Sequence, residues 1–85
     1  MASVLEIYID QACPGCTQAR KLAASVQEAI PGLEVRILDL THPNITKPPS
    51  IFVVPTYVLD GATVSLGNPN FEELVAKIEG SGKNS

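Results

Sequence analysis

Hydrophobic and polar residues alternate from Val4 to Ile9 and again from Leu33 to Asp39. A period of two indicates β-strands, because successive side chains of a strand point to opposite faces of the sheet. One face of both segments is uniformly aliphatic, whereas the other face mixes charged and apolar residues. The pattern therefore predicts a sheet with its first face under helices and a second face that needs no helix. The aliphatic face consists of Leu5, Ile7, Ile9, Leu33, Val35 and Ile37.

The segment between these two strands has a helical period from Pro14 onward. Its apolar stripe ends at Pro31-Gly32, a pair that stops a helix. A strand, helix and strand of this combined length make the two strands parallel, with a right-handed crossover. The stripe consists of Cys16, Ala19, Leu22, Ala23, Val26, Ala29 and Ile30.

Three prolines, Pro43, Pro48 and Pro49, fall between residues 40 and 50. Proline lacks a backbone donor and restricts the residue before it, so a regular helix of any length is not expected here. We expect an extended loop or one short turn. This loop is then the only cover for the second face of the sheet.

Two further strands are predicted from Thr56 to Leu59 and from Ala62 to Leu66. Asp60-Gly61 between them is a strong hairpin signal. A last helix follows, with Asn68 or Asn70 as its cap and a favourable pair between Glu73 and Lys77. Gly80 is expected to end it, which gives one domain over 1–80 and a disordered tail over 81–85. The apolar stripe of this helix is Phe71, Leu74, Val75 and Ile78.

The composition supports one small globular domain. The chain has 85 residues, 45% of them hydrophobic, and a formal net charge of −3. This charge disfavours nucleic acids and anionic membranes as partners, because both bind basic patches. No basic stretch precedes an apolar one at the N-terminus, and no apolar run approaches the ~18 residues of a membrane span. We therefore expect a cytoplasmic monomer.

The chain's two cysteines lie in Cys13-Pro14-Gly15-Cys16, between the first strand and the first helix. This spacing lets both sulfurs sit on the first helical turn, whose free N–H groups and positive dipole end stabilise a thiolate. Cys13 is then the nucleophile, and Cys16 is the resolving thiol that attacks the mixed disulfide. A disulfide across so short a loop adds little stability, so the pair is predicted to be a redox-active disulfide that needs no other cofactor.

A different class of function is metal handling. The two cysteines have the spacing of half a zinc site and His42 is the sole imidazole, but a second cysteine pair is missing. Zinc normally takes four ligands, so a structural site within one chain is disfavoured, and His42 is better explained as a solvated loop residue. Transient binding of a soft ion by two thiolates stays open. A redox-inactive interaction protein is hard to reconcile with both cysteines.

The strand that leads to Cys13-Pro14-Gly15-Cys16, together with Val54-Pro55-Thr56 and the hairpin after it, resembles the thioredoxin and glutaredoxin superfamily over residues 4–79. The resemblance implies a thioredoxin-like α/β fold. Its four-stranded mixed sheet would have the order 2-1-3-4, with two main helices on one face and the usual intervening helix short or absent. It also implies a cis Pro55 beside the dithiol. The substrate-binding residues implied are Pro14, Gly15, Val54, Pro55 and Thr56.

The same resemblance implies a thiol-disulfide oxidoreductase. Its substrates would be disulfide-containing proteins or small thiols, with a thiol reductase as the electron donor. Thioredoxin reductase, glutathione and another donor all stay open as that source. Asp10 lies where glutaredoxins carry a basic residue, and Ile7 lies where thioredoxins carry a buried acid. Asp10 could accept a proton from Cys16, but a solvated turn residue is the favoured interpretation.

Overall fold

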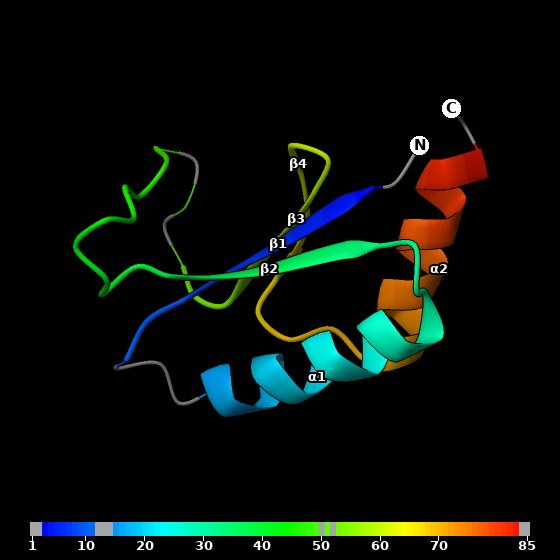
Figure 1. The fold of residues 1–85 in the computed structure, drawn as a ribbon, viewed down its shortest axis with the longest axis horizontal. Helices are drawn as coiled ribbons and strands as arrows, with labels where there is room; N and C mark the ends of the chain where they lie inside the picture. Colours follow the sequence, from blue (N-terminus) through cyan, green and yellow to red (C-terminus); the bar gives the residue numbers. More distant parts are fainter. Residues whose placement is uncertain (1–2, 12–14, 50, 52, 84–85) are drawn as a thin grey trace.

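The computed structural model of this 85-residue chain describes residues 3–11, 15–49, 51 and 53–83. These residues form four strands and two helices (Figure 1). In chain order they are β1 (Val4–Ile9), α1 (Cys16–Ala29), β2 (Glu34–Asp39), β3 (Thr56–Leu59), β4 (Ala62–Leu66) and α2 (Phe71–Lys83).

The strands form one mixed sheet in the order β2-β1-β3-β4. β1 and β2 are parallel, with Val4 opposite Glu34 and Ile9 opposite Asp39. β3 runs antiparallel to both β1 and β4. The α/β class, the mixed sheet and the strand order predicted above are confirmed.

One face of the sheet, here called the helix-covered face, packs against α1 and α2 (Figure 1). Aliphatic side chains of β1 point into this core, as their alternation predicted. Ile37 departs from the prediction, because its side chain is 36% exposed. The reason is that β2 forms an edge of the sheet, where the cover by the helices is incomplete. The buried core residues are Leu5, Ile7, Ile9, Ala19, Leu22, Ala23, Val26, Leu33, Tyr57, Leu59, Leu74 and Ile78.

The opposite face, here called the loop-covered face, has a smaller apolar cluster of Tyr8, Val58 and Ile51. Ile51 comes from the proline-rich connection and is only 1% exposed. Leu38 and Leu40 are partly buried against the same cluster. The described residues between β2 and β3 contain no helix, which confirms that the intervening helix is absent from them.

The bounds of three elements differ from the sequence predictions. α1 begins at Cys16 rather than near Pro14, and β2 begins at Glu34 rather than Leu33. α2 continues through Gly80 to Lys83, so the first three residues of the expected disordered tail are helical. A single glycine costs a helix only ~1 kcal/mol relative to alanine, which α2 tolerates.

The hairpin between β3 and β4 turns at Asp60 and Gly61, whose φ angles are 49° and 87°. Two consecutive positive φ angles define the type I′ turn that the sequence signalled. The pairing of β3 with β4 shifts between Tyr57 and Val58, which leaves Val64 as the extra residue of a bulge.

Lys77 has a different partner from the one predicted for it. Its ammonium donates to the carbonyl of Val64 at 2.7 Å. Glu73 instead accepts a hydrogen bond from the Asn70 amide at 3.0 Å. The predicted pair of Glu73 and Lys77 is therefore wrong, because each side chain has a tertiary or capping partner within closer reach.

Candidate functional site

The N-terminus of α1 lies close to the C-terminal end of β1, which places Gly15 and the backbone of Cys16 at one end of the sheet (Figure 1). Gly15 is the N-cap residue, and no side chain among the described residues caps this helix end. The first turn of α1 contains no acidic residue either. Its N–H groups and positive dipole end therefore stay available to an anion, such as a thiolate.

The structure places the predicted cysteines only in part. Cys16 is the first residue of α1, and its side chain lies outside what the structure describes. Cys13 and Pro14 also lie outside the described residues. The roles assigned to the two sulfurs thus stay predictions.

Pro55 is buried beside the cysteine motif, and the Val54–Pro55 peptide bond is cis, as the family resemblance implied. A Cβ atom on Gly15 would lie 3.7 Å from Cδ of Pro55. The Thr56 hydroxyl donates to the carbonyl of Val53 at 2.5 Å. Residues from two distant parts of the predicted site, Gly15 and Pro55, are therefore neighbours.

Asn68 joins these two parts, a role that the sequence analysis missed. Its side-chain amide donates to the carbonyl of Gly15 at 2.9 Å, and its side-chain oxygen accepts from the Tyr57 hydroxyl at 2.8 Å. The neighbouring Gly67 N–H donates to the carbonyl of Pro55 at 2.7 Å. The loop between β4 and α2 thus fixes the start of α1 relative to Pro55.

A signal for this role was present in the sequence. Asn70 with Glu73 three residues later forms the better capping pair, and Asn70 does accept from the Glu73 N–H at 2.7 Å. Asn68 was therefore not needed as a cap. Only the fold, however, could show that it reaches a residue 53 positions away.

Tyr57, the hydrogen-bond partner of Asn68, lies in the core. Its side chain is fully buried, and burial raises its pKa to about 12. The hydroxyl therefore stays protonated at neutral pH and remains a hydrogen-bond donor to Asn68.

Asp10 is not the solvated turn residue favoured by the sequence analysis. It is half-buried, and its Oδ1 atom is inaccessible and has no hydrogen-bond partner among the described residues. The chain after β2 folds over this position: the Leu40 N–H donates to the Ile9 carbonyl at 2.7 Å, and the Gln11 N–H donates to the Thr41 hydroxyl at 3.0 Å. The loop therefore lies beside Asp10, and the Oδ1 atom of Asp10 is shielded from solvent.

Comparison with known proteins gives one curated relative and several solved structures of the same fold. No family model matches the chain. A thioredoxin of Methanocaldococcus jannaschii is 29% identical over 77 residues, which cover 88% of this chain and 91% of that protein. Malaria-parasite thioredoxin-2 superposes with a TM-score of 0.79 at 15% identity, over 93% of this chain and 82% of that one. The chain is thus similar in sequence to one thioredoxin and in fold to another.

A second solved structure, Fasciola hepatica thioredoxin, superposes with a TM-score of 0.72 at 21% identity, over 92% of this chain and 79% of that one. The structural matches establish the thioredoxin-like fold. The similarity to the curated thioredoxin supports thiol oxidoreductase activity as the general function of the chain.

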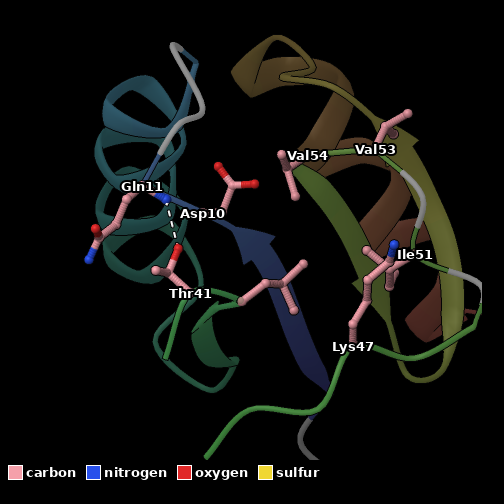
Figure 2. A pocket seen from close by; sticks show the side chains of 8 residues that line it. Asp10, Gln11, Thr41, Lys47, Ile51, Val53 and Val54 are labelled. Atoms are coloured by element: carbon pink, nitrogen blue, oxygen red, sulfur yellow. Dashed lines mark hydrogen bonds between the residues drawn. The ribbon is translucent and has the colours of Figure 1, made fainter. Parts of the chain in front are cut away.

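A pocket of about 400 Å³ opens next to Val54 on the loop-covered face of this thioredoxin-like chain (Figure 2). Aliphatic side chains form much of its wall, namely Leu40, Ile51, Val53 and Val54. Asp10 and Lys47 contribute its charged groups. The pocket occupies the side of the sheet that the proline-rich loop covers in place of a helix.

His42 is exposed in that same loop, and its Nδ1 accepts a hydrogen bond from the Asn44 N–H at 3.1 Å. This agrees with the solvated loop residue expected from the sequence. Neither α1 nor α2, the helices of the described residues, is long and apolar enough to cross a membrane.

Proposed function

We propose that this chain exchanges disulfides through Cys13 and Cys16, with Cys13 as nucleophile and Cys16 as resolving thiol. The observation that carries the proposal is the uncapped N-terminus of α1 at Cys16, held beside cis Pro55 by Asn68. An anionic sulfur there gains from the free N–H groups and the positive end of the helix.

The exchange takes two substitutions at sulfur. The Cys13 thiolate attacks one sulfur of a substrate disulfide, and the other substrate sulfur leaves and takes up a proton. Cys16 then gives up its proton and attacks Cys13 in the mixed disulfide, which releases the second substrate thiol. Two electrons and two protons pass to the substrate, and the Cys13–Cys16 disulfide is left for a thiol reductant to reduce.

The substrate-binding residues proposed are Pro14, Gly15, Val54, Pro55 and Thr56. Val54 is half-buried next to the cis bond and has an apolar side chain, so it contributes shape and backbone hydrogen bonds rather than charge. An extended substrate segment could pair with its backbone as an added strand. We propose disulfide-containing proteins or small thiols as substrates of a cytoplasmic monomer, with a thiol reductase as the electron donor.

Limited alkylation with iodoacetamide tests the assignment of roles. Cys13 is expected to react well before Cys16, because its pKa should lie below the free-thiol value of ~8.5. Mass spectrometry locates the label. Preferential labelling of Cys16 would reverse the two roles.

Matched cysteine variants test the mechanism itself. Cys13→Ser should abolish exchange, whereas Cys16→Ser should accumulate mixed disulfides at Cys13, because the resolving step is missing. Turnover is measured with a disulfide protein and either thioredoxin reductase or glutathione with glutathione reductase. Full turnover by Cys16→Ser would indicate a monothiol mechanism instead.

A further inference from the structure

The pocket beside Val54 combines one carboxylate and one ammonium group with aliphatic walls. Asp10 follows β1, whereas Lys47 comes from the loop after β2, so the two charges reach the pocket from separate elements (Figure 2). Within residues 3–11, 15–49, 51 and 53–83, neither side chain takes part in an ion pair. Both charges are therefore available to a bound molecule.

The state of Asp10 favours a cationic group as one end of that molecule. Its Oδ1 atom is shielded from water without a hydrogen-bond partner among the described residues, so the carboxylate is incompletely solvated. A cation that reaches the carboxylate from the pocket supplies part of the solvation that burial removed. Lys47 is exposed and long, and it can receive an anionic group at the other end.

We propose that this pocket binds the amino-acid unit of a low-molecular-weight disulfide such as cystine. The ammonium group pairs with Asp10, the carboxylate pairs with Lys47, and the aliphatic part lies on Ile51 and Val53. A purely cationic ligand meets repulsion from Lys47, and a purely anionic ligand meets repulsion from Asp10. Only a zwitterion satisfies both charges, and the volume of about 400 Å³ is ample for one amino-acid unit.

The position of the pocket connects binding to chemistry, a link that rests on the proposed exchange function. Val54 lines the pocket and precedes the cis Pro55 that adjoins Gly15. We place the disulfide of a bound cystine at the Val54 end of the pocket, the end that leads to Pro55 and Gly15. The reduced dithiol then converts one cystine to two cysteines and becomes the Cys13–Cys16 disulfide, with two electrons and two protons transferred.

Binding is tested without chemistry in a chain carrying both Cys13→Ser and Cys16→Ser. The chain is titrated with S-methylcysteine and the backbone amide signals are followed by NMR. The amide signals of Leu40, Val53 and Val54 should shift. Lys47→Met should weaken this binding on the order of tenfold, the effect of losing a charge-assisted hydrogen bond. Lys21→Met, an exposed lysine on α1, is the matched control and should change nothing. Absence of shifts, or equal effects of both lysine variants, would overturn the pocket assignment.

Selectivity is tested by oxidising the pre-reduced wild type in a single turnover with cystine, cystamine or 3,3′-dithiodipropionate. These share a disulfide core but are zwitterionic, cationic and anionic respectively. The rate for each disulfide is divided by the rate at which dithiothreitol reduces the same disulfide. This ratio removes the intrinsic reactivity of the disulfide. Cystine should be favoured on the order of tenfold over both, and Asp10→Asn or Lys47→Met should each remove the preference.

The outcomes separate the two proposals. Normal exchange with protein disulfides but no preference for cystine would reject the pocket assignment and leave the exchange function standing. Binding of S-methylcysteine without any exchange by the wild type would reject the exchange function and leave the pocket. A rate loss common to all three disulfides in Asp10→Asn would mean that Asp10 acts on the cysteines rather than on the ligand.

Discussion

The two faces of the sheet are covered by different means. On the helix-covered face, twelve described residues form one buried cluster between the strands and the two helices. On the loop-covered face, three buried residues form a cluster whose cover includes Ile51 from the proline-rich connection. The helices fill their side with regular packing, whereas the loop leaves a pocket beside Val54. The larger buried core and the pocket thus lie on opposite faces of one sheet.

The largest expected effect compares the two cores directly. Leu74→Ala on the helix-covered face should lower the free energy of unfolding by ~2–5 kcal/mol, because the packed helices relax little around the cavity. Ile51→Ala, at an equally buried position on the other face, should lower the free energy of unfolding by less. The loop that carries Ile51 can collapse into the cavity left by the substitution. Urea denaturation measures both. If both variants lost the same free energy of unfolding, the two covers would be equally rigid and the prediction would be wrong.

The next effect separates two asparagines of one loop. Asn68→Ala leaves the Tyr57 hydroxyl and the Gly15 carbonyl without their partner and should cost ~1–3 kcal/mol. It should also slow disulfide exchange, because the start of α1 is no longer held beside Pro55. Asn70→Ala removes a helix cap and should lower the free energy of unfolding by ~0.5–2 kcal/mol.

Asn70→Ala is the matched control for that experiment, since it should lower stability without slowing exchange at a temperature where both variants are folded. Stopped-flow exchange rates and thermal unfolding give the two readouts. Equal slowing by both variants would reduce Asn68 to a residue that only supports folding.

A third test uses one tyrosine from each face. The pKa of a tyrosine in the unfolded chain is ~10, whereas burial in the folded protein raises the pKa of Tyr57 to about 12. Between these values the unfolded state loses its proton first, so the Tyr57 contribution is complete below pH ~10 and declines as the pH rises toward 12. Tyr57→Phe should therefore be less stable than the wild type by ~1 kcal/mol at pH 7, with a gap that narrows above pH ~10.

Tyr8 provides the comparison on the loop-covered face. Burial, and secondarily the charge of Glu6, raises its pKa as well. Tyr8→Phe should also reduce the loss of stability at alkaline pH. The reduction should be smaller than for Tyr57→Phe, because Tyr8 lies under a thinner cover. Denaturation curves from pH 8 to pH 11.5 check both variants, and a parallel alkaline decline in wild type and Tyr57→Phe would contradict the prediction.

The smallest effect concerns the two glycines that flank α1. A Cβ on Gly15 would lie 3.0 Å from the Asn68 amide nitrogen, whereas one on Gly32 would have nothing within 4 Å. Gly15→Ala should displace Asn68 slightly, cost under ~1 kcal/mol and slow exchange by a small factor. Gly32→Ala should be neutral or stabilising by ~0.4–1 kcal/mol, because it restricts the unfolded chain. Exchange rates that respond equally to both changes would dissociate Gly15 from the site.

Much of the fold could be predicted because local patterns carry it. Alternation fixed the faces of β1, the residues Asp60-Gly61 specified the hairpin turn, and three prolines excluded a helix between β2 and β3. These features depend on backbone sterics within a few residues of chain. The same patterns did not reveal that α2 passes Gly80, because the cost of one glycine is small enough for a helix to absorb.

The features of the site that were missed depend on contacts across the fold. Asn68 reaches Gly15 from a loop 53 residues away, and nothing in its immediate sequence indicates that partner. Asp10 was interpreted as a solvated turn residue, because its neighbours in the chain do not show that the loop expected over this face would shield its Oδ1 atom. Composition and spacing thus pointed to the cysteine motif, while the residues that position and surround it required the structure.

The bulge at Val64 also bears on self-association. β4 is an edge strand, and an exposed edge can template pairing with another chain. The bulge breaks the regular spacing of that edge, and Lys77 occupies the Val64 carbonyl with a charged group. At the other edge, β2 presents the ion pair of Arg36 and Glu34 to solvent. The bulge and Lys77 at the β4 edge, and the ion pair at the β2 edge, therefore disfavour edge-to-edge pairing of this sheet with another chain.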